Sequence, residues 1–232
     1  MLHIVNNYTG DGMAFEMGRE LAEAEGINVA TVVVNDDVAV QDSTYTVGRR
    51  GVAGNFFVIK AVGAAAEAGA GLDDLVALGE RGNAVTRTMG MALTSCTPPA
   101  KGSPLFELGD DEMEMGVGIH GEPGRSRERL ASANEIVDAL VEAVVTDLPF
   151  QRGDAVALMI NGLGATPISE LYLLYGRAHE QLEGRGIQVG KSYVGEYCTS
   201  LDMAGCSVTL VRLDDQLVSL LDEPAEVAIR TF

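Results

Sequence analysis

Short apolar runs rich in β-branched residues alternate along this chain with longer segments of helical periodicity, and this alternation constrains the fold more than any other feature. Residues 2–5 form the first apolar run, and a helical pattern that includes Phe15 and Leu21 follows it and stops before Gly26. A second β-branched run occupies residues 27–34. This order predicts a βαβ unit, and its continuation along the chain predicts an α/β fold with parallel or mixed sheets.

Past residue 34 the pattern predicts a polar loop and then further helices and strands. The loop is expected at 35–54, helices are expected at 56–68, 72–80, 132–147 and from 167 onward, and strands are expected at 155–160, 187–194 and 207–213. Ser132 and Glu135 have the spacing of a capping box, and Thr166 before Pro167 is typical of an N-cap and the first helical position. Loop chemistry around the Thr97-Pro98-Pro99 run places a domain junction within residues 81–104.

The most informative local pattern is the run of residues 115–124, MGVGIHGEPG. Read as a strand, it sends its large apolar residues to one face and two glycines with His120 to the other. A bare face is typical of a backbone that a ligand approaches closely, which predicts a carbonyl-binding site with His120 as the nucleophile. The alternative is a buried histidine held by its neighbours, since strand glycines also mark bulges and bends. A dinucleotide site is excluded because the Glu-Pro-Gly end favours a turn where that site requires a helix.

Asp11 is the second candidate, because it follows the first predicted strand in a glycine-flanked turn and precedes a helix. One interpretation is a general base at the carboxyl end of a strand, where open α/β sheets bind ligands. The other is an N-cap that satisfies free backbone amides at the start of the helix. The residues alone leave both interpretations open.

Composition and charge exclude several classes of function. With 232 residues, 47% hydrophobic content and a net charge of −18, the chain can bury a sizeable core and would repel nucleic acid. It contains no run typical of a membrane span and no secretory leader, so a cytoplasmic protein is expected. The three cysteines form no C-x-x-C pair, and His3 and His179 lack metal-ligand spacing, so neither disulfides nor a metal site is expected. Gly190-Lys191-Ser192 lacks the earlier glycine of a phosphate-binding loop.

Six motifs, in order along the chain, resemble those of the dihydroxyacetone kinase K subunit. They are NYTGD at 7–11, NDDVAV at 35–40, GRRGVA at 48–53, GVGIHGEPG at 116–124, NGLGATP at 161–167 and GEYCTSLDM at 195–203. The chain is thus similar to this family nearly from end to end.

The resemblance implies a role for each candidate residue. His120 is expected to attack the ketone carbon of dihydroxyacetone and give a covalent hemiaminal, and Asp11 to take the substrate hydroxyl proton during phosphoryl transfer. Gly10 and Asn6 are expected to line the substrate site, although Asn6 replaces a lysine that is common in the family. For the paired arginines at 49–50 there are two interpretations, docking of a partner or phosphate and a solvated loop.

The resemblance also implies an architecture and partners. It predicts two α/β domains with mixed sheets at residues 1–85 and 86–222, and a tail at 223–232 that returns toward the first domain. The family's opening segment, whose histidine helps to hold the substrate, has no counterpart here, so the first domain is expected to be incomplete. No cofactor is expected on this chain; ATP or ADP with Mg²⁺ is expected on an L-type subunit. An M-type phosphotransferase-system component and a homodimer are the other expected partners.

Two alternatives to a kinase subunit stay open at this point. One is a non-catalytic ketone sensor or coactivator of the same fold, and the other is an inactive remnant of a truncated gene. The choice between dihydroxyacetone and larger ketoses also stays open, because it depends on the shape of the pocket.

Overall fold

The computed structural model describes residues 1–40, 48–121, 124–227 and 230–231. Within these ranges the elements follow one another in this order: β1 (Leu2–Asn6), α1 (Thr9–Ala24), β2 (Ala30–Val34), α2 (Asn55–Glu67), α3 (Leu72–Ala84), β3 (Thr86–Ala92), β4 (Glu112–Met115), β5 (Ser126–Arg129), α4 (Ala133–Asp147), β6 (Ala155–Gly162), α5 (Ile168–Gly184), β7 (Gln188–Gly195), β8 (Gly205–Arg212), α6 (Asp215–Asp222), β9 (Ala225–Glu226) and β10 (Arg230–Thr231).

The main sheet has six strands in the order β5-β4-β3-β8-β6-β7. β6 and β7 run parallel and are joined by α5, whereas β8 is antiparallel to both of its neighbours, and β3, β4 and β5 pair in antiparallel fashion. β1 and β2 form a separate parallel pair joined by α1, which confirms the predicted βαβ unit. The predicted α/β fold with mixed sheets is therefore confirmed.

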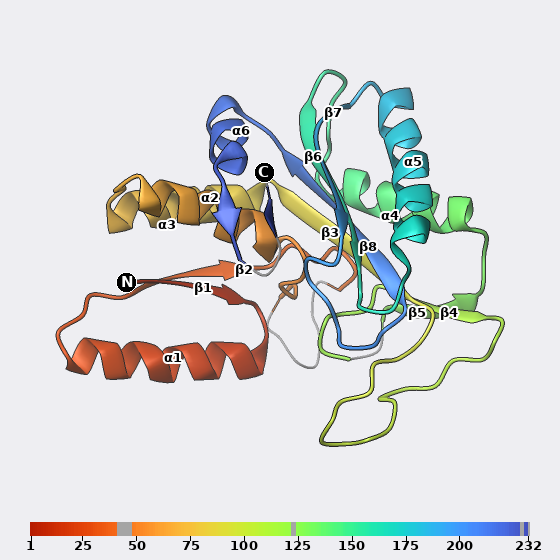
Figure 1. Ribbon diagram of the computed structural model, residues 1–232, viewed down its shortest axis with the longest axis horizontal. Helices are drawn as coiled ribbons and strands as arrows, with labels where there is room; N and C mark the ends of the chain where they lie inside the picture. The colour runs from red at the N-terminus through yellow and green to blue at the C-terminus, as the bar shows by residue number, and fades with distance from the viewer. Residues whose placement is uncertain (41–47, 122–123, 228–229, 232) are drawn as a thin grey trace.

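Helices cover both faces of the main sheet (Figure 1). α4 and α5 pack on one face in a hydrophobic cluster that includes Leu140, Leu158 and Leu171, and α2, α3 and α6 pack on the other. The side chains that carry these contacts are almost completely buried. This burial of apolar surface is the main force that holds the sheet and its helices together.

α1 contributes little to this core. It lies alongside β1 and β2 at the margin of the molecule (Figure 1), and none of its residues is buried. Met13, Met17 and Leu21 expose 65%, 64% and 70% of their surface. Neither α1 nor any other helix in the described part of the chain is long and apolar enough to cross a membrane.

The loop predicted at residues 35–54 is irregular where it is described, but it is buried rather than solvated; residues 41–47 lie outside the described part. The carboxylate of Asp36 accepts hydrogen bonds from the amides of Val52 and Gly54, at 2.8 and 2.7 Å. Burial raises the pKa of this carboxyl, while these hydrogen bonds oppose the shift. The loop is thus held by buried polar contacts.

One ion pair in this loop joins three segments of the chain. Arg50, 2% exposed, donates from Nε to Oδ2 of Asp37 at 2.7 Å and from Nη2 to the carbonyl of Gly116 at 2.6 Å. Burial raises the pKa of Asp37 to about 6, although the charge of Arg50 acts to lower it. Both interpretations of Arg50, a docking residue and a solvated loop residue, are therefore wrong. Arg50 is a buried structural cation.

The strand predicted to carry His120 is shorter than expected. β4 ends at Met115, and Gly116 has a φ of 77°, in the left-handed region where an extended strand cannot continue. The alternation of faces inferred for residues 115–120 is therefore wrong beyond Met115, and His120 lies in a loop. Residues 122–123, predicted to form part of a turn, lie outside the described part of the chain.

The two predicted helix starts have different outcomes. The capping box is confirmed, since the Glu135 amide donates to Ser132 Oγ at 3.4 Å and the Ser132 amide donates to the Glu135 carboxylate at 2.9 Å. Thr166, in contrast, is not the N-cap of α5, which is Pro167. The Thr166 hydroxyl instead donates to the carbonyl of Gly205 at 2.7 Å and accepts from its amide at 2.8 Å. This hydroxyl ties the loop to β8 instead of capping the helix.

The division into domains at residues 1–85 and 86–222 stays a prediction. One hydrophobic cluster draws side chains from both ranges, among them Val32, Phe57, Leu78, Ala157, Val211 and Leu217. At the start of the predicted tail, the carbonyl of Glu223 accepts a hydrogen bond from the ammonium group of Lys60 in α2.

Replacing Arg50 by methionine is expected to destabilise the protein by about 3–5 kcal/mol, because it leaves the Asp37 carboxylate buried without its cation. The loss should shrink as the pH falls, because burial raises the pKa of Asp37 and the lone carboxyl, without Arg50 to lower that pKa, takes up a proton more readily. Urea unfolding at several pH values measures both effects.

Arg19→Met is the control for this experiment, because Arg19 pairs with Glu16 and Glu23 on the exposed surface of α1. Little change in stability is expected there. If Arg50→Met were no more destabilising than Arg19→Met, the ion pair of Arg50 would not hold the loop.

Candidate active site

The connection between β1 and α1 sets the position of Asp11. β1 ends at Asn6 and α1 already begins at Thr9, so the N-cap is Tyr8 and Asp11 lies within the first helical turn. The predicted turn ahead of the helix and the N-cap interpretation of Asp11 are therefore both wrong. Its carboxylate is 37% exposed and lies beyond the carboxyl end of β1, the side of a parallel sheet on which ligands bind.

A loop that is fastened to the sheet at both of its ends carries His120. At the first end, the Gly116 amide donates to the carbonyl of Gly90 in β3 at 2.7 Å. At the second, the Arg125 amide donates to the carbonyl of Met115 at 2.6 Å. These contacts fix where the loop leaves the sheet and where it returns.

The loop turns sharply just after His120. Gly121 has a φ of 87°, and a Cβ atom there would lie 2.0 Å from Leu105 Cδ1 and 2.9 Å from Cys96 Sγ. Glycine is favoured at this position, because another residue would be strained in this backbone conformation and its Cβ would force the side chains of Leu105 and Cys96 to move. The His120 side chain itself remains 32% exposed, so solvent and small ligands can reach it.

Asp11 and His120, far apart in the sequence, lie side by side in the structure. The distance from His120 Nε2 to Asp11 Oδ2 is 3.6 Å, longer than a hydrogen bond. The Tyr8 ring stacks on the imidazole with ring centres 4.0 Å apart and planes at 28°. The fold therefore brings together the two residues singled out from the sequence and adds an aromatic ring to them.

Asn6 and Gly10 lie shortly before Asp11 in the sequence. Gly10 lies next to Asp11 in the first turn of α1, and a Cβ atom there would be in ordinary contact with the Tyr8 ring, at 3.9 Å. The Oδ1 atom of Asn6 is buried and has no hydrogen-bond partner among the described residues. An unpartnered buried acceptor is costly unless a ligand or water satisfies it. The roles of Gly10 and Asn6 in binding substrate stay predictions.

The segment at residues 49–51 is hydrogen-bonded both to the connection that precedes Asp11 and to the loop that carries His120. The Asn7 side chain donates to the Arg49 carbonyl at 2.6 Å, and the Gly51 amide donates to the Asn7 carbonyl at 3.3 Å. Arg50 reaches the other way, to the carbonyl of Gly116 at the base of the His120 loop. Three consecutive residues thus set the distance between the Asp11 turn and the His120 loop.

The cysteine thiols of the chain are poorly placed to act as nucleophiles. Burial raises the pKa of Cys198 and Cys206 to about 12, and Cys96 is buried as well. A buried thiol that stays protonated is inert. Within the described residues, no group of three or more histidine, cysteine, aspartate or glutamate side chains is placed to hold a metal ion.

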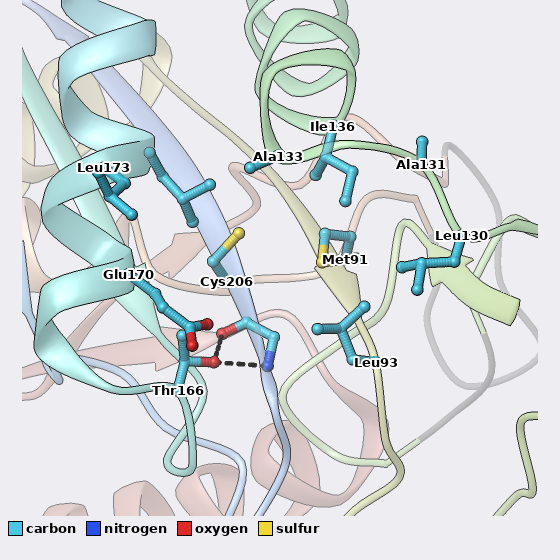
Figure 2. A pocket seen from close by; sticks show the side chains of 12 residues that line it. Met91, Leu93, Leu130, Ala131, Ala133, Ile136, Thr166, Glu170, Leu173 and Cys206 are labelled. Carbon is cyan, nitrogen blue, oxygen red and sulfur yellow. Dashed lines mark hydrogen bonds between the residues drawn. The ribbon is translucent and has the colours of Figure 1, made fainter. Parts of the chain in front are cut away.

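A separate hollow of about 240 Å³ lies between α4 and α5 at the ends of β3 and β8 (Figure 2). Most of its walls are hydrocarbon, from side chains that include Met91, Leu93, Leu130, Ile136, Leu173 and Cys206. The hydroxyl of Thr166 is already bonded to the backbone of Gly205, as the dashed lines in Figure 2 show. Apart from the Glu170 carboxylate, this hollow offers few groups for a polyhydroxylated ligand.

Two contributions to the site were not identified from the sequence: the stacking of Tyr8 on His120 and the structural role of Arg50. Tyr8 belongs to the NYTGD motif, but nothing in the local pattern indicates that its ring meets a histidine so distant in sequence. For Arg50, the neighbouring Asp-Asp pair at residues 36–37 was an available signal. A buried arginine needs carboxylate partners, and two acidic residues lie in the same loop.

Comparison with known proteins gives concordant results. A sequence profile of the Dak1 domain matches residues 1–229. The dihydroxyacetone-binding subunit DhaK of PTS-dependent dihydroxyacetone kinase 1 from Listeria innocua is 50% identical over 227 residues, which are 97% of this chain and 69% of that protein.

Two solved structures share the fold. The dihydroxyacetone kinase operon co-activator Dha-DhaQ superposes with a TM-score of 0.90 at 31% identity, over 97% of this chain and 70% of that one. The dihydroxyacetone kinase from C. freundii, in complex with AMP-PNP and Mg²⁺, superposes with a TM-score of 0.81 at 31% identity, over 95% of this chain and 40% of that one. The resemblance read from the six motifs is thus confirmed, and the chain belongs to the Dak1 domain family.

Proposed function

We propose that this chain is the dihydroxyacetone-binding subunit of a dihydroxyacetone kinase and that it holds its substrate covalently on His120. The observation that carries the proposal is the exposed imidazole of His120, whose Nε2 faces the Asp11 carboxylate across 3.6 Å. The 50% identity to a protein named as a dihydroxyacetone-binding subunit supports the same substrate.

The covalent step is an addition to the ketone. The lone pair of Nε2 attacks the ketone carbon, and a C–N bond forms as the π electrons of the carbonyl move onto oxygen. That oxygen takes up a proton while the proton on Nδ1 is released, so the product is a neutral hemiaminal. Glycerol has no electrophilic carbon, and capture of this kind therefore selects the ketone over the polyol.

Asp11 is assigned the role of general base. Its carboxylate lies beside the captured substrate and can accept the proton of a terminal hydroxyl as that oxygen attacks the phosphoryl donor. The gap of 3.6 Å leaves Nε2 without a hydrogen bond to the carboxylate, as an attacking lone pair requires. Asn6, whose buried Oδ1 has no partner among the described residues, is assigned as an acceptor for a substrate hydroxyl.

The phosphoryl donor is assigned to a partner. The C. freundii kinase that was solved with AMP-PNP and Mg²⁺ matches this chain over only 40% of its own length, which leaves ample chain for a nucleotide domain elsewhere. We therefore place ATP or ADP with Mg²⁺ on an L-type subunit. An M-type phosphotransferase component is in line with the relatives named as PTS-dependent. A homodimer of this chain and a cytoplasmic location complete the proposed setting.

A sensor function is the second candidate, because the operon co-activator has a TM-score of 0.90 to this chain. A sensor would capture dihydroxyacetone on His120 but yield no phosphate ester, even with an L-type subunit, ATP and Mg²⁺ present. Identity of 50% to a kinase subunit, against 31% to the co-activator, favours the kinase.

His120→Ala is expected to abolish binding of dihydroxyacetone, because it removes the nitrogen that forms the adduct. Calorimetric titration with dihydroxyacetone, and with glycerol as a non-electrophilic comparison, measures this. His179→Ala is a closely matched control: His179 is also about one-third exposed and lies 3.6 Å from a carboxylate, that of Glu183. Undiminished ketone binding by His120→Ala would contradict covalent capture at this residue.

Asp11→Asn is expected to leave capture intact and to slow phosphoryl transfer by roughly 10²–10⁴-fold, the usual contribution of a general base. Steady-state assays with an L-type subunit, ATP and Mg²⁺ measure the rate, and titration measures capture. Asp73→Asn is the control, since Asp73 occupies the first turn of α3 as Asp11 does in α1. Equal rates for Asp11→Asn and the wild type would remove Asp11 from the reaction.

A further inference from the structure

Tyr8 contacts the reacting imidazole but has no part in the chemistry described above. Its ring lies over the face of His120 at 4.0 Å, with the two planes only 28° apart. Contacts between aromatic rings contribute attraction beyond the apolar area that they bury. The contact joins the two segments that carry the site, the start of α1 and the loop after β4.

We propose that Tyr8 is a positioning residue that fixes the plane of the His120 imidazole for attack on the ketone. The proposal rests on the proposed function, because it assigns Tyr8 a part in that covalent capture. It concerns the orientation of the nucleophile and gives Tyr8 no bond to the substrate.

The loop around His120 supplies little orientation of its own. The residues at 116, 118 and 121 are glycines, so they offer no side chains to hold the ring, and the imidazole is 32% exposed. The lone pair of Nε2 lies in the plane of the ring, so it can attack the ketone carbon only when the edge of the ring points at that carbon. The orientation of the ring therefore contributes to the activation barrier of the addition. A contact with the face of the ring removes rotations that would turn Nε2 away.

Tyr8 is itself well anchored for this task. Its carbonyl accepts the Gly12 amide at 2.8 Å in the first turn of α1, and its backbone is extended, with φ of −149° and ψ of 138°. The same helical turn therefore places the Tyr8 ring against the face of the imidazole and the Asp11 carboxylate 3.6 Å from its Nε2 atom.

The stack also leaves the substrate a defined approach. Because Tyr8 covers one face of the imidazole, a ketone bonded to Nε2 must place its two hydroxymethyl arms at the ring edge or over the open face. The Asp11 carboxylate lies 3.6 Å from Nε2, so one arm is brought within reach of the base. Loss of the ring should therefore weaken capture and leave the later transfer step largely unchanged.

The test compares Tyr8→Leu, which removes the ring, with Tyr8→Phe, which keeps it. In assays with an L-type subunit, ATP and Mg²⁺, Tyr8→Leu is expected to raise KM for dihydroxyacetone roughly two- to tenfold, the range that aromatic stacking energies correspond to. The change in kcat should stay within about twofold, because the stack acts before transfer. Tyr8→Phe should restore KM to near the wild-type value.

Proton NMR gives a second readout that does not depend on activity. The chain has only three histidines, so the imidazole resonances of His120 can be assigned by substitution. Stacking under Tyr8 should shift the His120 resonances upfield in the wild type and in Tyr8→Phe. The shift should disappear in Tyr8→Leu, while those of His179, in α5, stay in place as an internal control.

The outcomes separate this proposal from the proposed function. If Tyr8→Leu had the KM of the wild type, or if it raised KM with no movement of the His120 resonances, the positioning role would be overturned although capture itself stood. If the wild type failed to bind dihydroxyacetone at all, the proposed function would fail, and this proposal with it. A raised KM with lost ring shifts, both restored in Tyr8→Phe, supports the positioning role.

Discussion

The geometry of the site depends on one buried interaction, the ion pair of Arg50 with Asp37 and the bond from the same guanidinium to the carbonyl of Gly116. A buried cation is tolerable only where carboxylate and carbonyl oxygens surround it, so these partners must come together for the chain to fold. Because the residues on either side of Arg50 hold the Asn7 turn, the same segment positions Asp11. Stability and site geometry are therefore set by the same contacts.

This arrangement places reactive groups at an accessible edge while the supporting groups are buried. His120 and Asp11 are each about one-third exposed, whereas Asp36, Asp37 and Arg50 are almost completely enclosed. A nucleophile must be reached by its substrate, but its orientation has to be fixed by something rigid. The glycine-rich loop leaves His120 accessible, and Arg50 in the buried loop at residues 35–54 holds the base of that glycine-rich loop through the carbonyl of Gly116.

The sequence predicted more of the fold than of the site geometry. Local signals such as β-branched runs and the capping box at Ser132 depend on neighbouring residues, and the structure confirms them. The strand expected through His120 was wrong because alternation alone does not reveal that Gly116 adopts a positive φ. The stack of Tyr8 on His120 and the burial of Arg50 depend on contacts between distant segments, which no local pattern encodes. His120 and Asp11 were both identified from the family resemblance, and the fold places His120 Nε2 3.6 Å from Asp11 Oδ2.

The most direct test of the central claim is whether a bond forms between His120 and the ketone carbon. NMR of the ¹⁵N-labelled protein with dihydroxyacetone labelled with ¹³C at its carbonyl carbon measures this. If His120 captures the ketone, the bound carbon becomes tetrahedral and shows one-bond coupling to Nε2 of His120. A bound substrate that keeps a trigonal carbonyl resonance, or a tetrahedral carbon coupled to a nitrogen other than that of His120, would contradict this claim.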